Sequence, residues 1–252
     1  MKSLVQHREI LLKARELQPR RLRIYAFRAV DDPESAHRFA EGHRLVLTNH
    51  GFTNVVSAEE SWIRNPNVWA VLVDSPDGSK TYGGARIHRY SSQYTLPMQD
   101  SVGYLDPTID VFIAANAGKG LGEICGLWNS VEVAGMGVGS EYLIRSGLAI
   151  AVNVGVNCMF AFCSPYTSRM AASFGFFPLA EIGNNGTFPY PTEKLIATVT
   201  FQEDTLTLPG AGQDQRNFIQ DLRVQPIQNR IETARNGISV EVEFNLAVKN
   251  EH

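Results

Sequence analysis

The stretch that most constrains the fold of this chain is residues 123–152, EICGLWNSVEVAGMGVGSEYLIRSGLAIAV. It opens with a short run of β-branched and aromatic residues ending at Val131 and Val133, which predicts a β-strand. Glycines then alternate with larger residues at positions 135, 137 and 139. Apolar residues at spacings of three and four follow, and this spacing predicts a helix with one buried side. They are Leu143, Ile144, Gly147, Leu148 and Ala151.

The glycine loop between this strand and helix has the features of an anion site. Glycine lets backbone amides approach a ligand because no Cβ atom is in the way. The first-turn N–H groups of a helix are unpaired and carry a positive partial charge, so the combination favours phosphate. The alternative is a tight turn that needs glycine only for its φ angles. The dinucleotide fingerprint G-x-G-x-x-G fails, because Ser140 or Tyr142 stands where its third glycine belongs.

Strand and helix signals elsewhere predict what surrounds this unit. Residues 67–74 and 82–90 predict a hairpin around an Asp-Gly turn. Residues 157–164 form a nearly continuous apolar run, which is typical of a buried strand parallel to the central one. Asp31 or Asp32 is the expected N-cap of a helix that begins at Pro33 and continues through Ala40.

Three later segments are interpreted from weaker patterns. Residues 99–121 are polar and glycine-bearing and are predicted to form a loop. Residues 227–234 are predicted to be a short helix, and residues 238–248 the last strand.

The loop AGMGVGS, residues 134–140, resembles the pyrophosphate-binding loop of the GCN5-related N-acetyltransferases, whose pattern is Arg/Gln-x-x-Gly-x-Gly/Ala. The preceding strand and the later SRMAASFGFF, residues 168–177, stand where that family has a strand and a helix ending in Gly-Phe. Two positions depart from the family pattern. Ala134 replaces the Arg or Gln, and Ala171 replaces a tyrosine that often serves as general acid.

This resemblance implies an α/β (α+β) fold, the acyl-CoA N-acyltransferase fold. Its sheet is expected to be mixed, mostly antiparallel and twisted, with about six to seven strands and helices on both faces. Residues 1–252 are expected to form a single domain. A helical extension at about 1–20 precedes it, and a helical insertion at about 209–236 stands before the final antiparallel strand.

A narrower resemblance concerns residues 83–100 and 122–128. They are similar to the autoinducer-synthase and N-acyl amino acid synthase branch of the family, which has a Gly-x-x-Arg strand, then Leu-Pro, then a Glu opening the central strand. Arg86, Pro97 and Glu123 stand at those places here, with Leu96 before the proline. Enzymes of this branch use fatty acyl chains, often delivered by acyl carrier protein, so this partner is also expected.

The resemblance also implies a co-substrate, acetyl-CoA or another acyl-CoA. Its pantetheine arm is expected along residues 128–133, bonded to strand-edge amides and carbonyls. The pyrophosphate is expected on the amides of residues 136–140. The candidate binding residues are Val131, Val133, Gly135, Met136, Gly137, Val138, Gly139 and Ser140.

Two side chains are candidates for proton transfer. Glu123 is the expected general base, with Glu132 second, because a carboxylate among apolar neighbours can have its pKa raised toward neutrality. The alternative is that Glu123 is an exposed acid at a strand end, or a partner for Arg86. Tyr166 is the expected general acid, near where the missing tyrosine would reach, and its alternative is a packed aromatic.

Charge and cysteine content exclude several classes of function. The formal charge of −3 argues against nucleic-acid binding, which needs a basic surplus. No apolar run has the length of a membrane span. Cys125, Cys158 and Cys163 are odd in number and lie in apolar stretches, so we expect free thiols in the cytoplasm. Their spacing matches no metal-ligand pair, so no metal site is expected.

The sequence therefore predicts an acyl-CoA-dependent N-acyltransferase acting on a primary amine of a small molecule. One alternative is a long-chain N-acyl amino acid or acyl-homoserine-lactone type of synthase that uses acyl carrier protein. Another is a non-catalytic protein that keeps the fold and senses a ligand.

Overall fold

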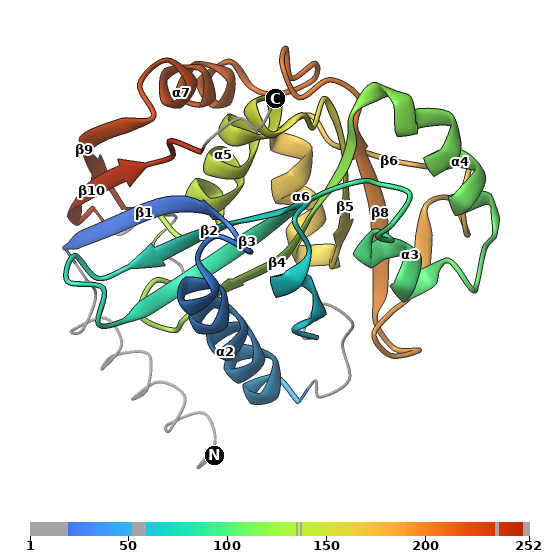
Figure 1. Cartoon of the computed structure of the whole chain (residues 1–252), viewed down its shortest axis with the longest axis horizontal. Coiled ribbons are helices and arrows are strands. Elements are labelled where there is room, and N and C mark those ends of the chain that lie inside the picture. The colour runs from blue at the N-terminus through green and yellow to red at the C-terminus, as the bar shows by residue number, and fades with distance from the viewer. Residues whose placement is uncertain (1–19, 52–58, 135, 137, 235–236, 249–252) are drawn as a thin grey trace.

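The computed structural model describes residues 20–51, 59–134, 136, 138–234 and 237–248, and its strands form one sheet (Figure 1). The order is β6-β8-β5-β4-β3-β2-β1-β10-β9, with β7 paired to β8. Among the described strands only β4–β5 and β1–β10 pair in parallel, so the sheet is mixed and mostly antiparallel as predicted. The strands are β1 (Arg21–Arg28), β2 (Val68–Asp74), β3 (Thr81–Arg89), β4 (Leu121–Asn129), β5 (Cys158–Cys163), β6 (Phe177–Pro178), β7 (Thr187–Pro189), β8 (Ile196–Gln202), β9 (Ile227–Thr233) and β10 (Ser239–Asn245).

Helices cover both faces of this sheet (Figure 1), which confirms the predicted architecture. One face carries α2, and the other carries α5 with α7 packed against it. Every residue of β2 is buried, because both of its faces are covered. The helices are α2 (Pro33–Asn49), α3 (Pro97–Val102), α4 (Thr108–Asn116), α5 (Ser140–Ala151), α6 (Pro165–Ser173) and α7 (Gln213–Val224), with short 3-10 turns at η2 (Ser61–Arg64), η3 (Ala117–Lys119) and η4 (Val152–Val154).

The predicted start of α2 is confirmed, although the helix runs to Asn49 rather than ending at Ala40, and its close approach to the sheet depends on a glycine. The Asp32 carboxylate accepts a hydrogen bond from the Ser35 amide at 3.0 Å, and Pro33 is the first helical residue. A Cβ atom at Gly42 would overlap the ring of Trp128 on β4. Because glycine leaves that space open, the Trp128 ring is buried between helix and sheet.

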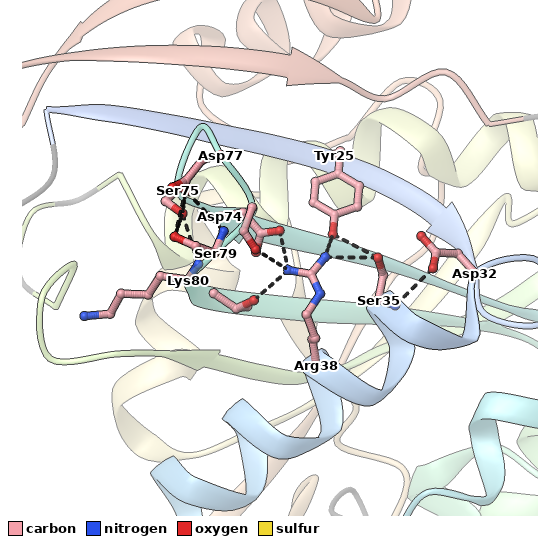
Figure 2. A network of polar contacts seen from close by, with 11 residues as sticks. Tyr25, Asp32, Ser35, Arg38, Asp74, Ser75, Asp77, Ser79 and Lys80 are labelled. Atoms are coloured by element: carbon pink, nitrogen blue, oxygen red, sulfur yellow. Dashed lines mark hydrogen bonds and ion pairs between the residues drawn. The ribbon is translucent and has the colours of Figure 1, made fainter.

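A polar network fixes α2 to the edge of the β2–β3 hairpin (Figure 2). Arg38 lies at its centre, and its Nη1 donates to Asp74 Oδ2 at 2.8 Å and to Thr81 Oγ1 at 3.1 Å. Its Nη2 donates to the Tyr25 hydroxyl at 2.5 Å and to Ser35 Oγ at 3.1 Å. Since Asp74 is only 1% exposed, this guanidinium neutralises a buried carboxylate.

The loop predicted over residues 99–121 is wrong, because this segment contains most of α3 and all of α4. Pro97 begins α3 after an extended Leu96, which suits proline at the first helical position. Met98 and Val102 are four residues apart, as are Ile109 and Ile113, and all four side chains are buried. They pack against β5 and β8 and so build a small separate core.

The helix predicted over residues 227–234 is also wrong, since this segment is the edge strand β9. Residues 227, 229, 231 and 233 are exposed and alternate with half-buried ones, a period of two. The expected helical insertion at about 209–236 is therefore the helix α7 followed by a strand. The last strand, β10, pairs antiparallel with β9 and in parallel with β1 at this edge of the sheet.

The sheet has ten described strands rather than the expected six to seven. Two of the additional strands are the short β6 and β7, which pair with β8. The single domain over residues 1–252 stays a prediction. The N-terminal extension at about 1–20 lies outside the described residues except for Arg20.

Candidate functional site

The central strand β4 and its parallel neighbour β5 separate part-way along their length. They pair only over residues 121–123 of β4 and 158–160 of β5. On its other side β4 shifts register against β3 between Gly84 and Arg86, opposite Gly126, which has a φ of +60°. Glycine adopts this φ without strain, so the bulge can form and β4 can bend away from β5.

A cavity of about 290 Å³ lies where these two strands diverge. Its walls come from β4, β5, β8, α5, α6, the loop around Tyr190 and one side of α2. They are mainly apolar: Ile124, Leu127, Ile144, Ala161, Phe162, Ala171, Phe176, Leu195 and Ala197. Because a water molecule accounts for about 30 Å³ of liquid, the cavity has room for several carbon atoms of an apolar chain.

The glycine loop leads from β4 to the N-terminus of α5. Gly135 and Gly137 lie outside the described residues. The side chains of Val133, Met136 and Val138 are buried in the core under α5. The N-cap of α5 is Gly139, which supplies no side-chain hydrogen bond to the first turn. This helix end therefore keeps the uncapped form expected of an anion site.

Two details of the loop limit how a ligand could lie on it. The Met136 amide donates to the Val133 carbonyl at 3.2 Å, so this donor is already used by the protein. The Asn129 side chain donates to Ser140 Oγ, and a Cβ atom at Gly139 would overlap Asn129. The amides nearest the helix start, from Val138 to Ser140, are thus the better candidates for binding a phosphate.

The predicted end of the central strand is wrong, since β4 stops at Asn129. The Ser130 carbonyl accepts hydrogen bonds from the Val133 amide at 3.3 Å and the Ala134 amide at 3.1 Å, which turns the chain. Val131 is exposed in this turn. None of residues 128–133, where the pantetheine arm was expected, lines the apolar cavity; residues 124–127 of β4 do.

Glu123 lies at the point where β4 and β5 part, and it is 1% exposed, so its interpretation as an exposed strand-end acid is wrong. Its Oε2 accepts a hydrogen bond from the Met98 amide at 2.9 Å. Burial raises the pKa of Glu123 to about 8, although the Met98 amide and the charge of Arg86 lower it. A carboxyl with this pKa can take up and release a proton near neutral pH.

Arg86 stands beside Glu123 and is buried between aromatic rings. Its guanidinium carbon is 4.4 Å from the ring centroid of Trp62 and 5.5 Å from that of Phe39. Nη2 donates to Cys125 Sγ at 3.8 Å. Burial raises the pKa of Cys125 to about 12, so this thiol stays protonated and does not serve as a nucleophile.

The other two candidates for proton transfer are Glu132 and Tyr166, and neither they nor Glu123 line the cavity. Glu132 is in the turn after β4, where its Oε1 is 2.5 Å from Lys80 Nζ. Burial raises the pKa of Glu132, but the bonds to Lys80 and Ser130 outweigh it and the pKa is lowered. Tyr166 is 79% exposed on α6, although its neighbours Pro165 and Thr167 line the cavity. Its role as general acid stays a prediction.

No protein-family model and no curated protein matches the sequence. Among solved structures, the chain is similar to FeeM, an N-acyl amino acid synthase from uncultured soil microbes. The TM-score is 0.55 at 15% identity, over 71% of this chain and 89% of FeeM. The chain has the acyl-CoA N-acyltransferase fold.

Two further structures share this acyltransferase fold. BjaI, a CoA-dependent acyl-homoserine lactone synthase solved with SAM and isopentyl-CoA, has a TM-score of 0.51 at 14% identity, over 91% of this chain and 94% of BjaI. TofI in an apo form has a TM-score of 0.51 at 11% identity, over 76% of this chain and 98% of TofI. The fold implied by the glycine loop is thereby confirmed.

Sequence reasoning missed the cavity walls that come from outside the central unit of this fold. His43 and Leu47 on α2 line the cavity and stand four residues apart, in line with buried Phe39. A predicted helix extended to Leu47 would have placed these two residues on the same face as Phe39, so the spacing was a usable signal.

No helix in the described part of the chain has the length and apolarity needed to cross a bilayer. Within the same residues, no group of three or more His, Cys, Asp or Glu side chains could hold a metal ion.

Proposed function

We propose that the protein is an N-acyltransferase that moves an acyl group from a coenzyme A thioester to a primary amine of a small molecule. The observation that carries the proposal is the apolar cavity between β4 and β5, together with the buried carboxyl of Glu123 at the point where these two strands part. The uncapped start of α5 supports a phosphate site next to it.

The reaction follows from what these groups can do. The amine nitrogen attacks the thioester carbonyl, the carbon–sulfur bond breaks, and an amide and coenzyme A are formed. Glu123, as carboxylate, accepts the proton that the amine loses. The leaving thiolate takes up a proton, and Tyr166 is the proposed donor. A carboxyl with a pKa of about 8 is a stronger base than an ordinary glutamate, which suits an amine acceptor.

The size of the cavity favours an acyl chain longer than acetyl. An acetyl group would occupy little of about 290 Å³, and each additional buried methylene adds about 0.8 kcal/mol of binding. This favours the second candidate, a longer-chain N-acyl synthase whose donor is an acyl-CoA or an acyl carrier protein. The similarity to FeeM and BjaI agrees with it. A cytoplasmic location is part of the proposal.

The test is the release of coenzyme A thiol from hexanoyl-CoA in the presence of primary amines, with the amide product identified by mass spectrometry. Wild type should release thiol only when an amine is present, and Glu123→Gln should lose most of this activity. The matched control is Glu132→Gln, which makes the same change in the turn after β4, where Glu132 is paired with Lys80, and this variant should retain the activity. Binding of hexanoyl-CoA without turnover of any amine would favour the non-catalytic alternative.

A further inference from the structure

The edge strand β9 is open at one margin of the sheet (Figure 1). Its only neighbour among the described strands is β10. Two of its exposed residues are large and apolar, since Ile227 is 62% exposed and Ile231 is 79% exposed. At the opposite margin, β6 and β7 are two and three residues long and each contains a proline. Short strands and proline keep a sheet edge from pairing, whereas β9 has seven residues and no proline.

The outward main-chain groups of β9 belong to its odd-numbered residues. In an antiparallel ladder, residues that bond the neighbouring strand alternate with residues whose N–H and C=O point away from it. The Leu246 amide donates to the Pro226 carbonyl at 2.8 Å, at one end of the β9–β10 hairpin. The register of the ladder then gives the bonds to β10 to the even-numbered residues of β9. The residues whose amides and carbonyls point outward are Ile227, Asn229, Ile231 and Thr233.

A second copy of β9 fits this edge. Two identical antiparallel strands related by a two-fold axis can pair so that each Ile231 lies opposite the Ile231 of the other copy. Outward groups then meet outward groups, because Asn229 of each copy lies opposite Thr233 of the other. These three pairs of residues can form about six main-chain hydrogen bonds between the copies.

In this register the charged residues of β9 lie opposite their complements. Arg230 of each copy is across from Glu232 of the other, and opposite charges at such positions stabilise a sheet. Moving the axis by one residue in either direction would instead oppose two arginines or two glutamates, which is unfavourable. Within one copy, Nε of Arg230 donates to Glu232 at 2.7 Å and Nη1 donates to Asp221 at 2.8 Å. Charge complementarity therefore selects the axis at Ile231.

The same register covers the exposed apolar side chain at the centre of β9. Ile231 lies opposite Glu241 of β10, whose carboxylate is 3.0 Å from the guanidinium of Arg21 on β1. The acid beside Ile231 thus has its own cation and is not left unpaired by association. Packing two Ile231 side chains against each other removes apolar surface from water and so favours the pair.

From these observations we propose that β9 is an interaction surface for a second copy of this chain. The two β9 strands pair antiparallel about Ile231 and join the two sheets into one. No residue of β9 lines the cavity between β4 and β5, so the inference goes beyond the proposed acyltransferase function and does not depend on it.

The first test is sedimentation equilibrium of the full chain from micromolar to submillimolar concentration. Wild type should approach twice the mass of the chain as its concentration rises. Ile231→Lys should weaken association by about tenfold or more, because like charges replace two apolar side chains that face each other. The matched control is Val111→Lys on α4, which changes another exposed apolar residue and should associate as wild type does. A monomer at every concentration, or equal association of wild type and Ile231→Lys, would overturn the proposal.

A proline variant tests the main-chain bonds separately from the side chains. Asn229→Pro removes an outward N–H, and the ladder with β10 does not use that group, so the fold should be retained. Association should weaken by about tenfold, because each copy loses one hydrogen bond. Asn229→Ala is the control, since it loses the same side chain, keeps the amide and should associate as wild type does. Equal association of the two variants would contradict strand pairing.

Disulfide formation tests the register. Opposed residues of a hydrogen-bonded pair have Cα atoms about 5.5 Å apart, which a disulfide can span. With oxidised glutathione, Ile231→Cys should therefore form a covalent dimer faster than Asn229→Cys, because two residues 229 would lie about 13 Å or more apart. Wild type is the control, because none of its three cysteines is exposed. Faster cross-linking of Asn229→Cys would overturn the pairing about Ile231.

Discussion

Replacing Glu123 with glutamine should remove a specific pH dependence of the protein's stability. The carboxyl is 1% exposed and its pKa is raised to about 8 from an ordinary value of 4.5, mainly by burial. Glutamine is uncharged at every pH and can still accept the Met98 amide hydrogen bond. The variant therefore imitates the protonated form of Glu123 and nothing else.

The sign and size of the effect follow from proton linkage. A group with a raised pKa in the folded state contributes its full stability below pH 4.5, and this contribution is lost as the pH rises toward 8. pH 7 lies about 2.5 pH units above the pKa of the carboxyl in the unfolded chain. Each of these units changes the free energy of unfolding by about 1.36 kcal/mol. Wild type should therefore lose up to about 3 kcal/mol relative to Glu123→Gln between pH 4.5 and 7.

The assay is urea unfolding of both proteins at several pH values between 4.5 and 8, followed by the fluorescence of Trp62, Trp69 and Trp128. The difference in the free energy of unfolding between wild type and Glu123→Gln should change steadily in favour of the variant as the pH rises. Glu132→Gln is the control, because the pKa of Glu132 is lowered and its titration gives no such trend. Parallel pH profiles for wild type and Glu123→Gln would refute the reasoning.

Three further substitutions test the fold and the site. Arg38→Met should lower the free energy of unfolding by about 3–5 kcal/mol, because it leaves the buried carboxylate of Asp74 without its cation. The control is Arg21→Met, which removes the exposed ion pair with Glu241 and should lower the free energy of unfolding by about 0–1 kcal/mol in the same denaturation assay. Gly126→Val should lower the free energy of unfolding by about 1–3 kcal/mol, because valine is strained at a φ of +60°. Release of coenzyme A thiol should also fall, because the bulge beside the apolar cavity is distorted. Unchanged stability would contradict this. Tyr166→Phe should lower kcat for hexanoyl-CoA by about 100-fold with little change in its KM, and an unchanged kcat would remove the role of this tyrosine as general acid.

Local signals predicted part of this fold well. The strand, glycine loop and helix of the central unit were found from residues that are neighbours in sequence, and so was the start of α2 at Pro33. The end of the central strand was predicted too far along the chain. Val133 is β-branched and so favours a strand, but its amide donates to the Ser130 carbonyl in a turn. In β9, Ile227 and Ile231 have the spacing of a helix, yet pairing with β10 decides the conformation.

The candidate site was only partly predictable, because local sequence patterns do not show which distant segments meet. Glu123 could be singled out because its apolar neighbours in sequence indicate burial, and the structure places it in the interior. The cavity walls come from α2, β5 and the loop around Tyr190, which are far apart along the chain. Which of these residues face one another depends on where β4 and β5 separate, and no local pattern determines that point.

The central claim is that an acyl chain lies between β4 and β5. Its most direct test is calorimetric titration of hexanoyl-CoA into wild type, Ala161→Leu and Ala149→Leu. Both alanines are buried, but only Ala161 lines the cavity. Hexanoyl-CoA should bind wild type and Ala149→Leu alike and bind Ala161→Leu about tenfold or more weakly, because three added carbons fill the space of the chain. Equal affinity for all three proteins, or no binding to wild type, would contradict the account.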